Sequence, residues 1–460
     1  MWKIRFMSML SCLIFAALAF AQLEKPPAGD APRDFILPEK HTFSLNNGLN
    51  ATLVSFGDLP KVTVRLVIRA GNLNEAGNQV WLADLTGDLM KEGTTSRSAE
   101  EIAQEAASMG GEVNISVGPD QTTVSGDVLT EFGPKLVELL ADIVQNPLLP
   151  DSELARLKRD LIRNLNIQKT QPRSIASEKF RQLLYGDHPY GRIFPTEEML
   201  NSYTIENVRA FYENNFGALR AHIYVAGRFD TQKMESTLRK AFGSWKAGPE
   251  PLVNNPQPTS ERIIHLIDRP DASQSTVFIG LPVVDPSHED YLKLQLTNTL
   301  LGGAFTSRIT SNIREDKGYT YSPFSQISSR YRDAYWVQVA DITTDVTGPA
   351  LREIFYEIDR LQDEPPSAEE LRGVQNYAAG IFVLRNGSRS GIIGQLSFLD
   401  LHGLDDSYLT EYVQHVHAIT PEEVQNMART YLRDDEMLIV IAGDRKKIYD
   451  QVSNYGRVVE

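Results

Sequence analysis

Two distant stretches of the sequence repeat one pattern, a helix start followed by a buried strand that ends in Ala-Gly. Residues 204–208 and 420–424 open the two predicted helices, and residues 223–227 and 439–443 close the two predicted strands. Identical residues recur at one common offset: Thr204/Thr420, Glu206/Glu422, Val208/Val424, Ile223/Ile439, Ala226/Ala442 and Gly227/Gly443. Chance could supply one such pair, but a whole set in register predicts a duplicated unit. The chain is therefore expected to contain two homologous halves.

Strand and helix signals are mixed irregularly within each half. In the first half, alternating segments predict strands at 41–45, 50–55, 62–69, 113–117 and 121–129. Helical periodicity predicts helices at 79–91, 98–109, 134–145, 151–169 and 174–185. The second half repeats the mixture, with predicted strands at 275–281 and 333–340. Because regular βαβ alternation is missing, the predicted class is α+β, each half a mostly antiparallel sheet with helices packed on one face.

Length and composition suggest where the domains divide. A chain of 460 residues is too long for one core of ordinary size, so two or more domains are expected. Residues 248–260 contain four prolines and several polar residues, which is typical of an interdomain linker. The halves would then cover residues 39–247 and 261–460. Residues 22–38, rich in Pro, Ala and Asp, are predicted to be an unstructured lead-in.

Residues 1–21 have the pattern of a cleavable export signal. Lys3 and Arg5 give a positive start, residues 10–20 are apolar or small, and residues 19–21 (Ala-Phe-Ala) offer a cleavage site. This run is shorter than the roughly 20 residues of a membrane span, and no later segment is apolar enough to be one. Cys12 is the only cysteine, so the mature chain would have no disulfide. We expect an exported protein, which suits the periplasm of a Gram-negative bacterium.

Composition and missing motifs exclude several functions. The formal net charge is −14, and an acidic protein repels phosphate backbones, so nucleic acid is not an expected partner. No Gly-rich phosphate loop and no Gly-x-Ser-x-Gly elbow occurs in the required form. His188 lies in an Asp-His-Pro-Tyr-Gly turn and is expected to order that turn by side-chain hydrogen bonds. His415 and His417 have no third partner in the sequence and are expected at the surface.

The first candidate site lies in the predicted helix 79–91, where Asp84 and Asp88 are four residues apart and share one face. This segment follows an Arg-Ala-Gly strand end and precedes Gly-Thr, and it resembles the zinc helix of the insulinase (pitrilysin) peptidases, the inverted zincins. Their motif is His-x-x-Glu-His, in which both His bind zinc and Glu is the general base. Here the resemblance puts Asp84 and Asp88 at the ligand positions and Gly87 at the base. All three functional residues therefore differ, and a glycine hydrogen cannot accept a proton.

A third ligand in this family is a Glu on a later helix, and Asp160 is the only acid in the corresponding stretch 159–164. Two or three carboxylates do not fill the oxygen cage that a hard cation needs. The resemblance therefore implies no bound metal in this chain. Two interpretations of this helix remain. It is either an exposed helix face with two acids or a weak metal site at Asp84 and Asp88.

The resemblance extends over nearly the whole chain after Pro38. Residues 184–192 (Leu-Tyr-Gly-Asp-His-Pro-Tyr-Gly-Arg) are similar to the segment that follows the third-ligand helix in the family. Residues 301–303, 307–308 and 313–321 are similar to its C-terminal half, and two duplicated halves arranged as a clam-shell are its plan.

Arg314 and Tyr321 are the second candidate site. They match the Arg and Tyr with which family members grip substrate and stabilise the tetrahedral intermediate from the half opposite the zinc. A guanidinium and a phenol hydroxyl can both donate hydrogen bonds to a developing oxyanion. The alternative is a salt-bridged Arg and a Tyr packed in the core.

In this family, paired chains can divide the work between a zinc-bearing subunit and a subunit with a degenerate helix. The resemblance therefore implies a non-catalytic, substrate-binding subunit of an exported heterodimeric zinc peptidase, inactive alone, with zinc in the partner. The expected partners are a homologous subunit with the zinc motif and a peptide or unfolded protein, while the linker 248–260 would let the halves open and shut. Two alternatives are a scaffold of the same fold with no peptidase role, and a stand-alone metallopeptidase that uses Asp84 and Asp88.

Overall fold

The computed structural model describes residues 34–459. The predicted export signal and most of the predicted lead-in therefore lie outside the described residues. Residues 34–39 form no helix or strand. Across the described range, every helix is too short or too polar to cross a membrane.

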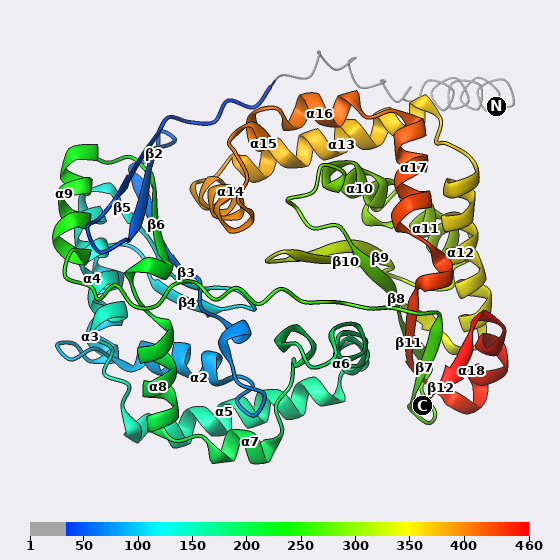
Figure 1. Cartoon of the computed structure of the whole chain (residues 1–460), viewed down its shortest axis with the longest axis horizontal. Helices are drawn as coiled ribbons and strands as arrows, with labels where there is room; N and C mark the ends of the chain where they lie inside the picture. Colours follow the sequence, from blue (N-terminus) through cyan, green and yellow to red (C-terminus); the bar gives the residue numbers. More distant parts are fainter. Residues whose placement is uncertain (1–33, 460) are drawn as a thin grey trace, which may run out of the picture. The chain divides into compact units, whose positions relative to one another are not determined.

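The first half contains a six-stranded sheet in the order β1-β2-β6-β3-β5-β4 (Figure 1). β2 and β6 are parallel, and the other neighbouring strands are antiparallel. The strands are β1 (Lys40–Ser44), β2 (Asn50–Ser55), β3 (Lys61–Ile68), β4 (Val113–Val117), β5 (Thr122–Leu129) and β6 (Ala221–Gly227).

The second half contains a six-stranded sheet in the order β12-β7-β11-β8-β10-β9. β7 is parallel to both β11 and β12, and the remaining pairs are antiparallel. The first sheet contains the consecutive strands β2-β6-β3-β5-β4, and the second contains β7-β11-β8-β10-β9. Both sets show the same succession of parallel and antiparallel neighbours. This match confirms the two homologous halves. The strands are β7 (Ile263–Asp268), β8 (Gln274–Val283), β9 (Phe324–Arg330), β10 (Asp333–Thr343), β11 (Leu438–Gly443) and β12 (Arg457–Val459).

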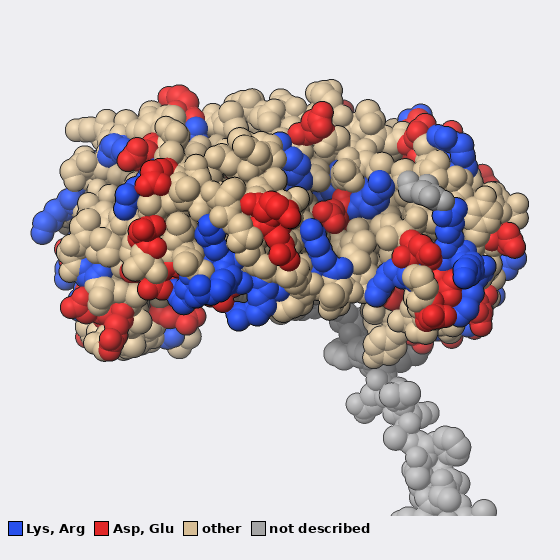
Figure 2. Space-filling view, turned by 90° about the horizontal axis from the view of Figure 1, so that it is seen from below, with Lys and Arg blue, Asp and Glu red and all other residues tan. Residues whose placement is uncertain are grey.

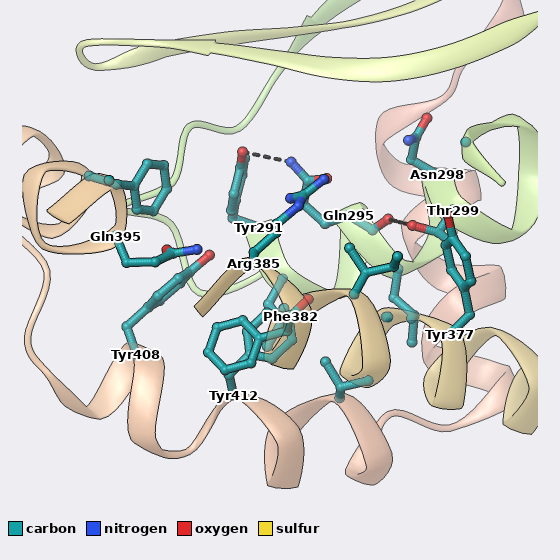
Figure 3. A pocket seen from close by; sticks show the side chains of 18 of the residues that line it. Tyr291, Gln295, Asn298, Thr299, Tyr377, Phe382, Arg385, Gln395, Tyr408 and Tyr412 are labelled. Atoms are coloured by element: carbon teal, nitrogen blue, oxygen red, sulfur yellow. Dashed lines mark hydrogen bonds between the residues drawn. The ribbon is translucent and has the colours of Figure 1, made fainter. Parts of the chain in front are cut away.

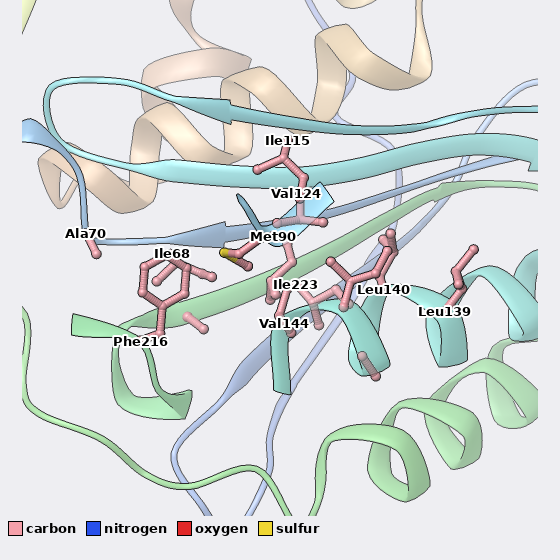
Figure 4. Packing of buried hydrophobic residues seen from close by; sticks show 14 of the residues in the cluster. Ile68, Ala70, Met90, Ile115, Val124, Leu139, Leu140, Val144, Phe216 and Ile223 are labelled. Carbon is pink, nitrogen blue, oxygen red and sulfur yellow. The ribbon is translucent and has the colours of Figure 1, made fainter. Parts of the chain in front are cut away.

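The alternation of side chains along β3 explains why the first sheet has an apolar face that packs against the helices of the same half. Every second residue of this strand is fully buried in the core of the first half: Val62, Val64, Leu66 and Ile68. On the helix side, Leu140 and Val144 lie beside Ile223 of β6 (Figure 4). The helices of this half are α2 (Leu82–Leu89), α3 (Ala99–Ser108), α4 (Gly133–Gln145), α5 (Asp151–Thr170), α6 (Pro172–Tyr185), α7 (Glu197–Ser202), α8 (Ile205–Asn215) and α9 (Thr231–Phe242).

The second half is richer in helices and includes two π-helical segments, at Thr299–Gly303 and Ser311–Asp316. The first of these ends at the Gly-Gly pair, as a helix stop should. The α-helices are α10 (Tyr291–Asn298), α11 (Arg308–Thr310), α12 (Thr347–Asp363), α13 (Ala368–Asn386), α14 (Arg389–His402), α15 (Ser407–Thr410), α16 (Tyr412–Ala418), α17 (Pro421–Tyr431) and α18 (Arg445–Val452).

Each sheet has a second face, and the other half of the chain covers it. On the first sheet, Val67 and Tyr224 join Phe382 of α13 and Ile393 of α14 in one buried cluster. On the second sheet, residues of β8, β10 and β11 form a buried cluster with Phe180 and other residues of α6. The predicted one-sided helix packing therefore holds within each half, while the opposite faces are buried between the halves.

The predicted linker forms no helix or strand, but hydrogen bonds tie it to the first half. Arg220 Nε donates to the Glu250 carbonyl at 2.9 Å, and the Thr259 amide donates to the Leu184 carbonyl at 3.0 Å. Opening of the halves about this linker would have to break these bonds and expose both interface clusters. Opening and closing therefore stays a prediction.

The helix predicted at 79–91 begins three residues later, at Leu82, and its last turn is a 3₁₀ turn at Met90–Glu92. Trp81 has a left-handed backbone with φ of 67°, which ends helical geometry on its N-terminal side. Its ring Nε1 donates to the Ile193 carbonyl at 2.9 Å, and this tertiary contact holds the indole in place. Sequence periodicity does not contain that information.

Candidate functional site

The predicted metal helix is α2, and its two aspartates have different partners. Asn72 Nδ2 donates to Asp84 Oδ2 at 2.8 Å, and burial raises the pKa of Asp84. Asp88 Oδ1 accepts a hydrogen bond from Lys91 Nζ at 2.9 Å on the surface. Asp84 is therefore a partly buried structural group, whereas Asp88 faces solvent, so the interpretation as an exposed face with two acids is wrong for Asp84.

Glu75 is a buried carboxyl that no sequence motif marks. Its Oε1 accepts from the Ala83 amide at 2.8 Å and from Asn72 Nδ2 at 3.1 Å, and its Oε2 accepts from the Trp81 amide at 3.2 Å. These bonds satisfy free amides at the N-terminus of α2. Burial dominates nevertheless and raises the pKa of Glu75 to about 8. Asn72 thus bridges the buried carboxyl of Glu75 and the partly buried carboxyl of Asp84 beside the start of α2.

Gly87 stands where the family has its general base, and it is buried against β4. A Cβ added there would lie 2.8 Å from Val117 Cγ2, so the helix packs closely on the sheet at this point. Asp160, the candidate third ligand, is exposed on α5 and pairs with Arg163 at 3.1 Å and Arg156 at 3.4 Å.

These residues do not fit zinc. Neither Asp84 nor Asp88 is a free ligand, Gly87 has no base, and Asp160 is neutralised by two arginines. Over residues 34–459, no three or more His, Cys, Asp or Glu side chains gather as a metal site would require.

Arg314 and Tyr321 are brought together, and a third residue joins them. Arg314 Cζ lies 4.3 Å from the ring centroid of Phe305 and 5.4 Å from that of Tyr321. Phe305 is 67% exposed and Tyr321 is 80% exposed. The alternative of a core tyrosine is therefore wrong, because Tyr321 faces solvent beside a guanidinium that makes cation–π contacts. We call Phe305, Arg314 and Tyr321 the aromatic–arginine platform.

Rigid neighbours position the platform. The Tyr319 amide donates to the Ile313 carbonyl at 2.8 Å, and Thr320 Oγ1 donates to the Asp341 carbonyl of β10 at 2.8 Å. Gly318, with φ of 65°, provides the turn between Arg314 and Tyr321.

Arg314 also forms an ion pair with Glu315, whose Oε1 is 2.9 Å from Arg314 Nη1. An incoming acceptor must compete with this carboxylate. Because Glu315 is exposed, the competition costs little.

On the other side of the platform, the Gly302–Gly303 pair leads to Phe305. A Cβ at Gly302 would lie 2.5 Å from Ser325 Oγ and 2.8 Å from Gln338 Oε1. Only glycine allows this close approach of the π-helical segment to β9 and β10. The sequence motif indicates the glycine pair but not Phe305, because nothing in the pattern marks an exposed aromatic residue two positions after it.

The two candidate sites belong to different halves of the chain. α2 packs with the first sheet and its helices, whereas the platform borders the second sheet. His188 Nδ1 accepts from the Tyr190 amide at 3.2 Å, as predicted, and His415 is exposed on α16. His417 is only half-exposed and its Nε2 is buried, so the predicted surface position holds for His415 alone. On the face seen in Figure 2, acidic and basic side chains are intermingled and neither forms one continuous patch.

Fold and site together define a two-domain relative of the zinc peptidases whose metal helix has lost its ligands. Two sequence models of one peptidase family match the chain, "Insulinase (Peptidase family M16)" over residues 57–195 and "Peptidase M16 inactive domain" over residues 202–377. The chain belongs to the insulinase family, peptidase family M16.

Similar proteins are described as zinc proteases. An uncharacterized zinc protease of Rickettsia felis is 26% identical over 332 residues, which cover 71% of this chain and 79% of the relative. The uncharacterized zinc protease YmxG of Bacillus subtilis is 24% identical over 413 residues, which cover 87% and 97%.

Solved structures share the fold. The peptidase M16 inactive domain from Pseudomonas fluorescens superposes with a TM-score of 0.82 at 25% identity, covering 88% of this chain and 98% of that one. A protease from Helicobacter pylori gives 0.82 at 20% identity, covering 89% of this chain and all of that one. The periplasmic protease PqqL of Escherichia coli gives 0.75 at 17% identity over 92% of this chain, but only 47% of PqqL is covered.

Proposed function

We propose that this chain is the non-catalytic, substrate-binding subunit of an exported heterodimeric zinc peptidase that cleaves peptides or unfolded proteins. The observation that carries the proposal is the exposed platform: Arg314 contacts two aromatic rings that face solvent. The Arg314 side chain is itself only 22% exposed, so the two rings form the outer surface of the platform. In the complex, Arg314 and Tyr321 donate hydrogen bonds to the oxyanion that develops at the partner's zinc.

The state of α2 supports a division of labour between two chains. Asp84 is held by Asn72 and Asp88 by Lys91, so the residues of α2 perform structural work. Zinc and general base would then come from a homologous subunit with an intact His-x-x-Glu-His helix. A stand-alone metallopeptidase that uses Asp84 and Asp88 is disfavoured by the same contacts.

Substrate binding would use the sheet edge next to the platform. β9 is the edge strand of the second sheet, and it begins at Phe324, three residues after Tyr321. An extended peptide that adds to an edge strand gains main-chain hydrogen bonds regardless of its sequence. This mode suits substrates that are unfolded. The N-terminal signal pattern supports a periplasmic location for the complex, and the structurally similar PqqL is described as a periplasmic protease.

The test mixes the purified chain with a zinc-motif relative and measures cleavage of an unfolded peptide. Activity should appear in the mixture and should fall about 100-fold or more with Arg314→Ala and about 10-fold with Tyr321→Phe, as for loss of oxyanion donors. Arg352→Ala and Tyr356→Phe on α12 are matched exposed controls and should leave activity unchanged.

The alternatives give different results. Tight association without activity in any mixture would point to a scaffold. Chelator-sensitive activity of the chain alone would point to a stand-alone enzyme. Equal activity of Arg314→Ala and the native chain in the mixture would contradict the role of the platform.

A further inference from the structure

A cavity of about 610 Å³ lies in the second half, outside both candidate sites. α10, α13, α14, α15 and α16 supply its walls, together with the first π-helical segment. Figure 3 shows side chains from these helices directed into one space. Its volume suits a small organic molecule or the end of a peptide.

The charge of the cavity comes from one side chain. Arg385, on α13, is the single charged residue among the described residues that line it, and no acid lines it. Within residues 34–459, the Arg385 side chain has neither a hydrogen bond nor an ion pair. In Figure 3 it reaches from α13 toward Tyr291 and Gln295. A guanidinium without a carboxylate partner is free to bind an anion.

Three further side chains that can donate hydrogen bonds line the same cavity as Arg385. In the part of the chain that the structure describes, the side chains of Gln395, Tyr408 and Tyr412 make no hydrogen bond, although all three line the cavity. Burial raises the pKa of Tyr408, so its phenol stays protonated and keeps its donor. On the opposite wall, by contrast, Gln295 Nε2 donates to the Tyr291 hydroxyl at 2.6 Å. One side of the cavity is therefore satisfied, and the other side offers donors.

Apolar walls complete the cavity. The rings of Phe382 and Tyr412 stack with centroids 4.1 Å apart and planes 13° apart. Phe398, Ile381 and Leu292 also line the space. A ligand that fits must bring an apolar or aromatic body and hydrogen-bond acceptors.

We propose that this cavity binds an organic monocarboxylate with an aromatic or apolar body, its carboxylate held by Arg385 with Gln395 and Tyr408. One guanidinium matches one carboxylate, whereas a phosphate dianion would leave charge unpaired. The carboxylate can belong to the C-terminus of a peptide or to a free carboxylic acid. The proposal rests on the cavity alone and is independent of a partner subunit.

The test is calorimetric titration of the isolated chain with three probes: N-acetyl-phenylalanine, N-acetyl-phenylalanine amide and 3-phenylpropionate. The carboxylate should bind at one site about tenfold or more tightly than the amide, because a charge-assisted pair replaces a neutral one. Arg385→Gln should remove that difference. Arg372→Gln, at an exposed position on the same helix, should keep it.

The probes also separate the two sources. Equal affinity for 3-phenylpropionate and N-acetyl-phenylalanine identifies a free-acid site, and binding of the acetylated amino acid alone identifies a peptide C-terminus. The thermal midpoint of Arg385→Gln checks that the variant is folded. Three results would overturn the proposal: equal affinity for acid and amide, unchanged acid binding by Arg385→Gln, or no saturable binding of either acid up to about 10 mM.

Discussion

Arg314 shows how a weak sequence signal becomes a site. An Arg and a Tyr seven residues apart say little by themselves, but their place within residues 313–321, which resemble the C-terminal half of the family, favours a role for them. The structure adds Phe305, which contacts the same guanidinium from a different segment. The residue pair could be predicted because both members lie in one local motif. Phe305 could not, because its contact depends on the path of the π-helical segments.

Glu75 leads to a prediction about pH. Its folded pKa is about 8, above the ordinary value of 4.5, so the folded protein retains a proton that the unfolded chain loses between these values. Stability should therefore fall as pH rises through this window, by up to about 1.4 kcal/mol per pH unit from this group. Glu75→Gln removes the titration. Its free energy of unfolding, measured by urea denaturation, should improve relative to the native chain from about pH 5 to about pH 8.

Glu100→Gln, at an exposed position on α3, serves as the control and should follow the native profile. A constant difference between Glu75→Gln and the native chain at both pH values would show that Glu75 is ionised in the folded protein. Glu75 could not be identified from sequence, since its burial comes from contacts between the loop before α2 and the helix itself.

At the scale of elements, most strands and helices agree with the periodicity of the sequence. The predicted bounds of β2 and β4 match the structure to the residue, and a capping box between Ser98 and Glu101 begins α3 where the helix 98–109 is predicted. α2 begins three residues later than predicted, because the indole of Trp81 is fixed by a distant carbonyl, and β10 runs three residues beyond the predicted 333–340. The local sequence pattern thus predicts the bounds of a helix or strand, except where a tertiary contact changes them.

A substitution at Gly302 tests whether the first π-helical segment supports the platform. Gly302→Ala places a methyl group within 2.5 Å of Ser325 Oγ, which forces the segment away from β9. We expect a loss of about 1–3 kcal/mol in the free energy of unfolding, as for overpacking, and weaker activation of the zinc partner. Chemical denaturation and the mixed-chain peptidase assay measure the two effects.

The matched control is Gly373→Ala on α13, where an added Cβ meets nothing within 4 Å. This variant should be neutral or more stable by up to about 1 kcal/mol, because alanine favours a helix over glycine. Should both variants behave alike, the close packing at Gly302 does not support the platform.

At the scale of the whole molecule, the duplication was predictable and the interface between the copies was not. Matched helix and strand motifs recur at one spacing, and the two sheets indeed share their strand order. The apolar faces that join the halves look like ordinary core positions in sequence. Phe180 of α6, for example, is buried against Phe278 and Tyr335 of the second sheet. Sequence periodicity indicates that one face of a helix or strand is buried, but it does not indicate which half of the chain covers that face.

This interface predicts cooperative unfolding of both halves. Phe180→Ala should cost about 3–5 kcal/mol and split the single thermal transition into two, because it removes the centre of one interface cluster. Phe216→Ala, equally buried within the core of the first half, should cost a similar amount without splitting the transition. Calorimetry distinguishes the outcomes, and identical profiles for the two variants would contradict the role of the interface.

The central claim, that this chain lends binding groups to a partner's zinc, is tested most directly by the zinc content of the active complex. We expect one zinc per pair of chains, unchanged by Asp84→Asn and Asp88→Asn in this chain, and no zinc or turnover in the isolated chain. Stoichiometric zinc in the isolated chain, with peptide cleavage that is lost on Asp84→Asn or Asp88→Asn, would contradict the account.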